Sequence, residues 1–400
     1  MNRKILIFTT RQLCYCSAAF FAARLADAFE EMGDHVTCCE LEEQTNCGDG
    51  ADNELSDASV SRLEQFLDNS FDAVIDFDSR LPRMILDDGS YYLDHIHAPF
   101  FNYILDHPLY HHATLSCELN HYNVILVDRL QCEYVQRYYP HIETVLWQPL
   151  GASEAVCGRR DDQKEKQILF MGTYRNPEQY LEQISQEDDN LSYIMQQAID
   201  LLLEPGQPAC VEQALRKVLD DFGGCPEDSA FRIMMNRCYP IELYLRNYRR
   251  KQAVDALVTA GLPVTITGDW WDRYPGIEAD NVSWQQPVSF AQSYDRIAHM
   301  AVLLDSAPFF TAGIHDRVMA GFANRTAVLT ENNVVKEGMP LMTYDFIHPQ
   351  MLVECATDLL INEANRKGIV DKGHEYYLQH GTWGCVAIGL SRQIDLVNQK

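Results

Sequence analysis

Apolar residues along this 400-residue chain gather in short runs separated by segments of helical spacing. A nearly continuous apolar run is typical of a strand buried on both faces, and the first such run is residues 4–8. After a polar loop, residues 17–32 have apolar positions at helical spacing and end at Gly33, a common C-terminal residue of helices. The alternation continues with a helix predicted at 59–68 and further apolar runs within 35–41, 71–79, 100–112, 122–128 and 143–151. Strands that alternate with helices predict an α/β fold with a doubly wound parallel sheet.

A polar, charged stretch at residues 157–167 marks a predicted boundary between two domains. The segment after it, QILFMGTYRNPEQY, has the same shape as the opening segment KILIFTTRQLCYC: an apolar strand, a loop with Thr and Arg, then a helix. Two such beginnings in one chain predict two Rossmann-like domains. We expect an N-terminal domain at 1–156, a second domain at 157–375 with a helical insertion at about 177–240, and a C-terminal helix at 376–400 that returns to the first domain.

The second domain resumes its alternation after the insertion. The pattern predicts helices at 246–261 and 289–300, strands within 262–270, 281–288 and 301–308, and a mostly helical tail from 372 to 397. Within the insertion, breaks are expected at EPGQP (204–208) and GGCPED (223–228), because Gly and Pro interrupt helices. The acidic stretch at 42–57 is expected to be an exposed loop.

Composition narrows the class of protein. With 46% apolar residues the chain can build real cores, and its net charge of −26 opposes a nucleic-acid partner. The 13 cysteines are odd in number and lack zinc-type spacing, which favours reduced thiols. The N-terminal apolar run breaks at residues 9–12, unlike a signal peptide, and no stretch has the ~18 apolar residues of a membrane span. We therefore expect a soluble, cytoplasmic protein with no integral membrane span.

Residues 309–332, FFTAGIHDRVMAGFANRTAVLTEN, are the segment best suited to hold an anion. A predicted helix follows Gly313, and a helix start presents unpaired N–H groups and the positive end of the helix dipole, which suit a diphosphate. Arg317 can add a bidentate, charge-assisted contact to phosphate, although an ordinary ion pair with a carboxylate is the alternative. An acidic protein can keep such a site, because salt screens distant charges over about 8–10 Å.

In its setting after the strand AVLLDSAP, this segment resembles the donor-binding segment of GT-B glycosyltransferases, and in particular of their CgeB-like (spore maturation protein) branch. Four further motifs occur in the expected order: DHPLYHH, ILFMGTYRNP, VTITGDWW and HGTW. The resemblance implies two Rossmann-like domains facing a cleft. It also implies a nucleotide-diphosphate sugar donor in the second domain, an acceptor in the first, and neither a metal nor another cofactor.

The predicted donor-binding residues follow three strands of the second domain, at the carboxyl ends where α/β folds bind ligands. They are Gly172, Thr173, Tyr174, Arg175, Gly268, Asp269, Trp270, Gly313, Ile314, His315, Asp316 and Arg317. A plain turn between strand and helix is the alternative for the first four. Trp270 or Trp271 would stack on the base, unless the ring belongs to the core. His315 would bond a phosphate oxygen or cap the helix.

Two positions depart from the GT-B pattern. Many enzymes of this architecture carry a Glu one turn into the helix, where it holds the donor ribose, and this chain has Ala320 there. A Gly usual before the last strand is Arg325 here. Asp316 and Glu331 are the candidates to take over ribose binding, although neither stands at the usual position.

On the acceptor side, Asp106 and His107 follow an apolar strand of the first domain. An inverting transferase needs a base that deprotonates the acceptor hydroxyl, and His or Asp can serve; a retaining enzyme can work without one. The alternative is a capped turn with satisfied polar groups. His107 and His111 could share a helix face and hold a metal, but Pro108 favours a turn, so we predict no metal site.

These observations favour a glycosyltransferase, of hexosyltransferase type, that moves a sugar from a nucleotide-diphosphate donor to an unknown acceptor, which is a glycan, a protein or a small molecule. A non-catalytic nucleotide- or sugar-binding protein on the same scaffold is the main alternative, and Ala320 is its support. A Rossmann dehydrogenase is disfavoured, because no GxGxxG follows a strand with an acidic residue about 20 positions later.

Overall fold

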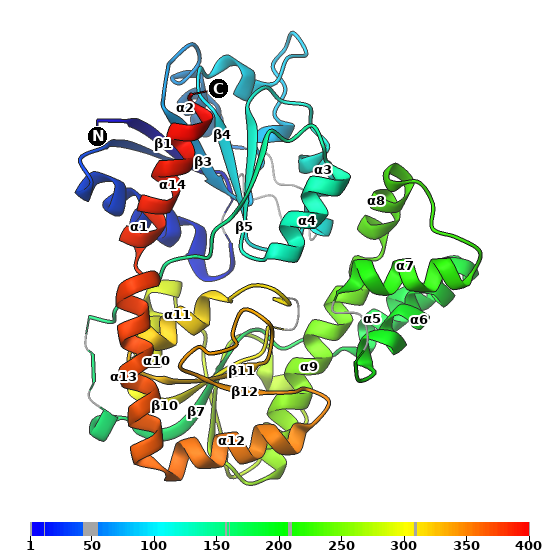
Figure 1. The fold of residues 1–400 in the computed structure, drawn as a ribbon, viewed down its shortest axis with the longest axis vertical. Coiled ribbons are helices and arrows are strands. Elements are labelled where there is room, and N and C mark those ends of the chain that lie inside the picture. The colour runs from blue at the N-terminus through cyan, green and yellow to red at the C-terminus, as the bar shows by residue number, and fades with distance from the viewer. Residues whose placement is uncertain are drawn as a thin grey trace. The chain divides into compact units, whose positions relative to one another are not determined.

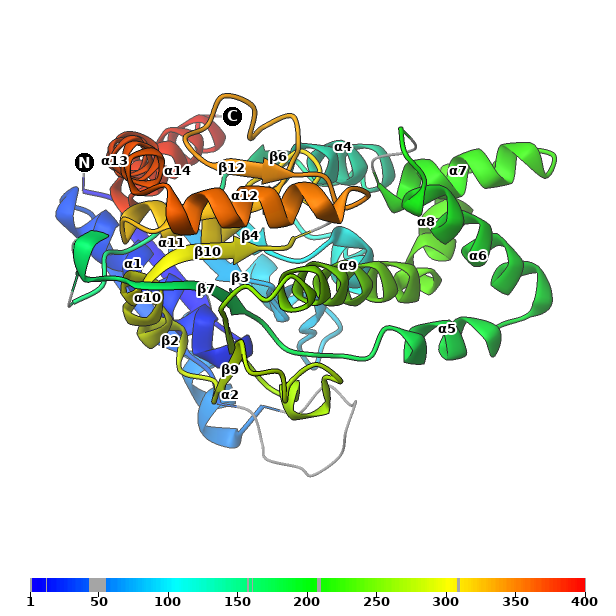
Figure 2. The same ribbon diagram turned by 90° about the horizontal axis from the view of Figure 1, so that it is seen from below.

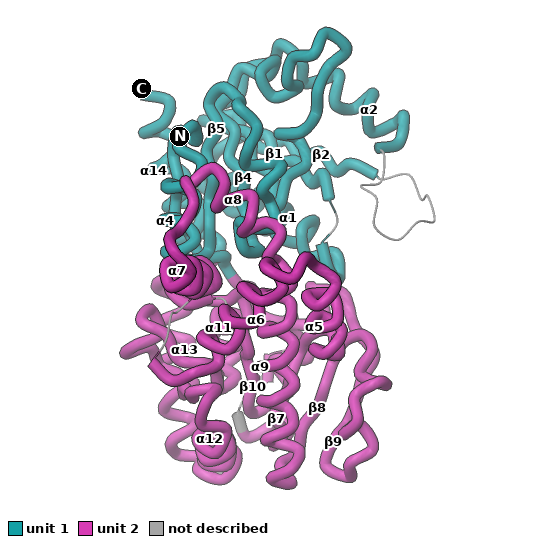
Figure 3. The backbone as a smooth tube through the Cα atoms, turned by 90° about the vertical axis from the view of Figure 1, so that its right-hand side faces the viewer, with its two compact units in different colours: residues 1–151, 383–400 teal, residues 152–382 magenta. Residues whose placement is uncertain are grey.

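We describe the protein from a computed structural model, which covers residues 2–11, 13–42, 55–156, 158–159, 161–206, 210–307 and 310–399. The chain forms two compact units (Figure 3). Unit 1 contains Met1–Gly151 and Trp383–Lys400, and unit 2 contains Ala152–Thr382. Each unit has a six-stranded sheet with helices, which confirms the predicted α/β class with two Rossmann-like sheets. Most of the predicted acidic loop at 42–57 lies outside the described residues.

The sheet of unit 1 has the order β2-β1-β3-β4-β5-β6, with parallel neighbours throughout. Strands β1, β3, β4 and β5 of this sheet are labelled in Figure 1. Its strands are β1 (Lys4–Thr9), β2 (His35–Glu40), β3 (Ala73–Phe77), β4 (Phe100–Ile104), β5 (Tyr122–Leu126) and β6 (Thr144–Trp147). Its helices are α1 (Ser17–Glu31), α2 (Asp57–Glu64), α3 (His112–Leu115), α4 (Arg129–Tyr138) and α14 (Trp383–Val397). Strands β3, β4 and β5 are buried along their whole length, which is why they appear as nearly continuous apolar runs in the sequence.

The C-terminal helix α14 completes unit 1 by packing on α1, at the opposite end of the chain. The rings of Phe21 and Trp383 lie 5.9 Å apart between the two helices. Arg3 at the start of the chain makes a buried ion pair with Asp34 at 2.7 Å and donates to the carbonyl of Ser391 at 3.0 Å. A buried charge is tolerated when it is paired and hydrogen-bonded, so this contact ties α14 to the edge of the sheet.

The sheet of unit 2 has the order β12-β11-β10-β7-β8-β9, again with parallel neighbours. Its strands are β7 (Glu165–Met171), β8 (Val264–Thr267), β9 (Val282–Gln285), β10 (Met300–Asp305), β11 (Ala327–Glu331) and β12 (Met342–Tyr344). Around the sheet lie α9 (Tyr239–Thr259), α10 (Phe290–His299), α11 (Asp316–Ala323), α12 (Pro349–Ile361) and α13 (Glu363–His380). This is the Rossmann order, in which the chain runs outward in one direction from β7 and in the other from β10.

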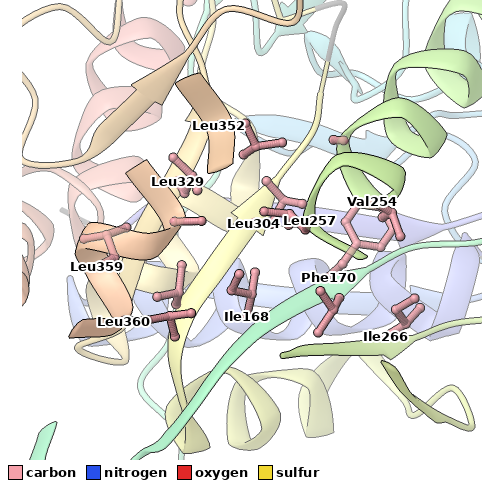
Figure 4. Packing of buried hydrophobic residues seen from close by; sticks show 14 of the residues in the cluster. Ile168, Phe170, Val254, Leu257, Ile266, Leu304, Leu329, Leu352, Leu359 and Leu360 are labelled. Atoms are coloured by element: carbon pink, nitrogen blue, oxygen red, sulfur yellow. The ribbon is translucent and has the colours of Figure 1, made fainter. Parts of the chain in front are cut away.

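A continuous core joins the sheet of unit 2 to α9 and α12 (Figure 4). Strand β7 contributes Ile168 and Phe170, which are fully buried against Val254 and Leu257 of α9. Helix α12 adds its own apolar face, including Leu359, over the neighbouring strands. Burying such side chains stabilises the unit by about 1.5–3 kcal/mol each. The core therefore holds α9 in a defined position beside the carboxyl ends of the strands.

The predicted helical insertion in the second domain is present. It consists of α5 (Glu178–Ser185), α6 (Asp189–Leu203), α7 (Val211–Asp221) and α8 (Asp228–Arg237), and α6 to α8 project away from the sheet of unit 2 (Figures 1 and 2). The side chain of Asp188 caps α6 by accepting from Leu191 N–H at 3.0 Å. The expected break at 223–228 separates α7 from α8, and the part of the break at 204–208 that is described follows α6.

Three elements differ from the prediction. Helix α9 begins at Tyr239, earlier than the expected 246, with Pro240 in its first turn, where proline is favoured. The tail is two helices instead of one, because the chain breaks at Gly381 between α13 and α14. A Cβ at Gly381 would lie 2.7 Å from Met319 Sδ, so the break is also a close packing point. Strand β12 was not predicted.

Candidate active site

The carboxyl edge of the unit 2 sheet brings together the three loops that the sequence singled out. Strands β10, β7 and β8 are neighbours, and the loops begin at Ser306, Gly172 and Gly268 directly after them. The strand order reverses between β7 and β10: the strands that follow β7 add on one side of it, and those that follow β10 add on the other. Doubly wound sheets bind ligands at this point, outside the carboxyl ends of the strands.

The loops after β7 and β8 are joined backbone to backbone. Gly172 N–H donates to Thr267 O at 3.0 Å, and the indole N–H of Trp271 donates to Gly172 O at 2.7 Å. A Cβ at Gly268, whose φ is +151°, would lie 2.0 Å from Gly172 O. The approach is so close that only glycine fits at position 268. These contacts hold the two loops together at the carboxyl edge of the sheet.

The loop after β10 is organised by a buried carboxylate. Nδ1 of His315 lies 3.0 Å from Asp305 Oδ1 and 3.1 Å from Asp316 Oδ1, and it lies 3.4 Å from Arg317 N at the start of α11. Burial alone would raise the pKa of Asp305, but the charges of His315, Lys336 and Arg317 hold it well below its usual range. Asp305 therefore stands as a buried anion beside His315 and Arg317.

Arg317 keeps unused hydrogen-bonding capacity at this edge. Its Nη1 atom is buried and has no hydrogen-bond partner among the described residues. The nearest carboxylate oxygen, Oδ1 of Asp305, lies 3.8 Å away, which is too long for a hydrogen bond. A buried polar atom without a partner is costly in a native protein, and a bound anion would satisfy it.

Helix α9 carries an arginine cluster that the sequence analysis did not assign to the site. Arg246 pairs with the buried Glu242 at 2.6 Å, and Arg249 pairs with Glu331 at 3.3 Å. Arg250 has no ion pair with any carboxylate in the described part of the chain. The run RNYRR, with arginines at i, i+3 and i+4 on one helix face, was the signal that could have indicated it.

The side chain of Arg250 reaches the point where the strand order reverses. Its Nε donates to Ser306 O at 3.5 Å, and its Nη1 would lie 3.9 Å from a Cβ built on Gly172. Burial and the neighbouring charges of Arg246 and Arg317 lower the pKa of Arg250 to about 9. Two arginines that repel each other beside glycine-rich loops form a site that is stabilised by a polyvalent anion.

Other predicted donor residues divide into edge and core positions. Arg175 stacks on Trp270, with Cζ 3.5 Å from the ring centroid, and Trp270 has a left-handed backbone conformation that is unusual outside glycine. The side chain of Tyr174 instead packs on Trp271 in the core, and Ile314 is buried. The side chains of these two residues therefore belong to the core and not to the sheet edge.

The positions considered for ribose binding are also defined. Ala320 is buried in α11 and has no polar side-chain atom. Both carboxylate oxygens of Glu331 are engaged, one by Ser306 at 2.8 Å and the other by Arg249. Asp316 lies in the first turn of α11 with its carboxylate beside His315. Of the two substitutes, Asp316 is less constrained.

The acceptor-side candidates lie in unit 1, at the end of β4. Asp106 is exposed, whereas His107 is 7% exposed and caps a short 3-10 helix, Pro108–His111. Nδ1 of His107 accepts from Leu109 N–H at 3.1 Å. The cap was one of the two interpretations of this turn.

The end of β3 carries a polar cluster that the sequence analysis missed. Asp76 is fully buried and accepts from the hydroxyls of Thr10 at 2.5 Å and Ser79 at 2.6 Å. Burial raises its pKa to about 7 despite these bonds. Asp78 follows, with His111 Nε2 at 3.3 Å from its Oδ1. The sequence signal was DFDSR directly after an apolar strand.

Within the described ranges, no group of three or more His, Cys, Asp or Glu side chains is arranged to hold a metal ion. None of the helices described is both long and apolar enough to cross a membrane.

No protein-family model matches the chain, and no curated protein matches it. Solved structures match it along almost its whole length. An alpha-glucosyltransferase (AGT) in complex with UDP has a TM-score of 0.58 at 11% identity, covering 99% of this chain and 100% of that one. A sucrose-phosphate synthase from Thermosynechococcus elongatus has a TM-score of 0.56 at 9% identity, with coverages of 99% and 100%.

A third similar structure is the DNA modifying enzyme beta-glucosyltransferase, with a TM-score of 0.51 at 9% identity over 98% of this chain and 99% of that one. Identities this low speak for the fold alone. The chain therefore has the fold of the GT-B glycosyltransferases, as its motifs predicted.

Proposed function

We propose that this protein is a glycosyltransferase that moves a sugar, of the hexose type, from a nucleotide-diphosphate donor to an acceptor. Unit 2 binds the donor and unit 1 binds the acceptor. The observation that carries the proposal is the pair Arg250 and Arg317, which stand beside glycine-containing loops where the strand order of the unit 2 sheet reverses. Arg250 has no ion pair with a described carboxylate, and Nη1 of Arg317 is buried without a hydrogen bond to a described residue. The motifs that resemble the CgeB-like branch support the same assignment.

In this proposal the diphosphate is held from two sides. Arg317 and the N–H groups between Gly313 and Asp316 approach from the start of α11, and Arg250 approaches from α9. Gly172 leaves room for the phosphates beside Arg250. A hydrogen bond to a charged group contributes about 1.5–3 kcal/mol, whereas the dipole of a helix start contributes about 0.3–1 kcal/mol. The arginine side chains should therefore dominate affinity for the diphosphate.

The nucleoside part of the donor is assigned to the loops after β7 and β8. Thr173 and Asp269 stand there, and the Arg175–Trp270 stack offers an aromatic surface for the base. Asp316 is the proposed ribose ligand in place of the carboxylate that Ala320 cannot supply. Similar structures contain UDP and UDP-glucose, which supports a uridine donor.

The acceptor is a glycan, a protein or a small molecule, and Asp106 with His107 belongs to its proposed site. Several similar structures are DNA-modifying or DNA-bound enzymes. A net charge of −26 opposes binding to a phosphate backbone, so we do not propose DNA as the acceptor of this protein.

A non-catalytic nucleotide-binding protein is the second candidate, and the observation that favours it is Ala320 in place of the usual carboxylate. Release of a nucleoside diphosphate from the donor, with water as the acceptor, separates the two. Tight donor binding with no turnover would favour the second candidate.

The experiment that tests the proposal is a thermal-shift screen across UDP-, GDP-, dTDP- and CMP-sugars, followed by calorimetry. A ligand at 100 times its dissociation constant stabilises by about 2.7 kcal/mol. Arg317→Ala should weaken binding of the nucleoside diphosphate about ten- to a hundredfold and leave the bare nucleoside almost unchanged.

Arg325→Ala is the matched control, because that arginine is exposed and only approaches Asp371, at 3.7 Å. Its substitution should leave both affinities unchanged. Equal losses for nucleoside and nucleoside diphosphate in the Arg317 variant would contradict the phosphate assignment.

A further inference from the structure

Unit 1 has its own reversal point, and a buried carboxylate–imidazole pair stands at it. In the sheet β2-β1-β3-β4-β5-β6, the strand order reverses between β1 and β3. Asp78 follows β3 directly, and His111 ends the 3-10 helix Pro108–His111 after β4. Doubly wound sheets bind ligands at such a point, so the pair lies where an acceptor is expected.

The imidazole of His111 has unmet hydrogen-bonding capacity. Its side chain is 8% exposed and that of Asp78 is 2% exposed. Nε2 lies 3.3 Å from Asp78 Oδ1, in an ion-pair contact, but forms no hydrogen bond with any described residue. No contact with a described residue engages Nδ1 either. A buried imidazole without hydrogen bonds can exchange a proton with a bound hydroxyl. The neighbouring carboxylate would stabilise the cation that forms.

The carboxylate of Asp78 is held in place by the backbone. Leu105 N–H donates to its Oδ1 at 3.0 Å, and Asp78 has a φ of 47°, a conformation rare for a non-glycine residue. Ser79 and Thr10, both bonded to Asp76, hold the same loop against β1. The geometry of the pair is therefore set by the fold and not by the pair itself.

The charges that face Asp78 come from three segments. Burial raises the pKa of Asp78, the charge of His111 lowers it, Asp106 after β4 raises it, and Arg11 after β1 lowers it. The imidazole of His111 is thus in direct contact with a carboxylate that is costly to bury without a partner.

His107 is less suited to accept a proton. Its Nδ1 already accepts from Leu109 N–H, so the neutral ring carries its proton on Nε2 and can donate there but not accept. The two histidines therefore have different chemical capacities although they lie in one turn.

We propose that His111, oriented by Asp78, is the base of the transfer reaction; this rests on the proposed function. His111 takes the proton of the acceptor hydroxyl, and the hydroxyl oxygen forms a bond to the anomeric carbon. The bond from that carbon to the phosphate oxygen breaks, and its electron pair leaves with the nucleoside diphosphate. Attack opposite the leaving group inverts the configuration at the anomeric carbon. Asp78 is a positioning residue.

The test measures UDP release from UDP-glucose with water as the acceptor, and UDP binding by calorimetry, on the full chain. His111→Ala should lower turnover by about 10²–10⁴ and leave the Kd of UDP within about twofold. Asp78→Asn should lower turnover by at least tenfold without changing UDP affinity. Added imidazole should restore part of the turnover of His111→Ala, which a purely structural role would not allow.

His121→Ala is the matched control, because His121 also pairs with a carboxylate, Glu143 at 3.3 Å, but on the surface of the same unit. It should keep full turnover. His111→Gln, which preserves most of the volume, guards against a folding defect in the alanine variant.

The outcomes separate the two proposals. Normal turnover in folded His111→Ala and His111→Gln, or loss without imidazole rescue, overturns the role of His111 while UDP release by the wild type sustains the transferase. A wild-type protein that binds UDP-glucose without releasing UDP, or that binds no nucleotide sugar, overturns both.

Discussion

Replacing Arg250 by Met should stabilise the ligand-free protein and weaken its binding of UDP. The substitution removes the charge and keeps most of the length of the side chain. Burial and the repulsion from Arg246 and Arg317 lower the pKa of Arg250 from its usual range to about 9, which corresponds to about 5 kcal/mol against the charged form. Solvent still reaches part of the side chain, so we discount the gain to about 1–3 kcal/mol in the free energy of unfolding.

The same charge should help the bound state. An ionic hydrogen bond to phosphate contributes about 1.5–3 kcal/mol, so Arg250→Met should raise the Kd of UDP about ten- to a hundredfold. The sign with pH follows from the lowered pKa: the cost of the charge is fully present below about pH 9 and is relieved as pH rises through that value. At neutral pH, stability and binding should therefore change in opposite directions.

Urea unfolding at pH 7, with and without UDP, measures both effects, and calorimetry supplies the Kd. Arg325→Met is the control for loss of an exposed arginine and should leave both quantities within about 0.5 kcal/mol. The reasoning is refuted if Arg250→Met destabilises the ligand-free protein, or if it binds UDP as tightly as the wild type.

Two further predictions concern single groups in each unit. Gly268→Ala should lower the free energy of unfolding by more than about 2 kcal/mol and weaken UDP binding, because its Cβ would meet Gly172 O at 2.0 Å. Gly261→Ala is the control, since Gly261 also has a positive φ but faces open space, and it should lower the free energy of unfolding by only about 1 kcal/mol. Chemical denaturation of both variants checks this, and similar losses would argue against the contact. Because burial raises the pKa of Asp76 to about 7, its contribution to stability should fall as pH rises from about 4 to 7. Asp76→Asn should flatten that part of the pH profile of the unfolding free energy, and an unchanged slope would contradict the shift.

The local pattern of the sequence determined the type and order of most elements. Strands such as β5 and β10 are buried on both faces, and a strand in that environment is apolar at most of its positions, so it is visible without any partner. Short β12 has only one fully buried residue, Tyr344, and was missed for the same reason. The break at Gly381 depends on contact with Met319, which no local pattern reports.

The site divides in the same way. The sequence identified loops after strands, since polar and glycine residues that follow an apolar run are a local signal. Only the tertiary structure decided which of these loops share an edge, because strand order places β7 between β10 and β8 although they are distant in sequence. Arg250 of α9 donates to the carbonyl of Ser306 after β10, and Asp78 after β3 contacts His111 after β4; both contacts depend on packing that periodicity does not encode. The chemistry of a polar side chain depends on the groups around it, and tertiary packing determines which groups those are.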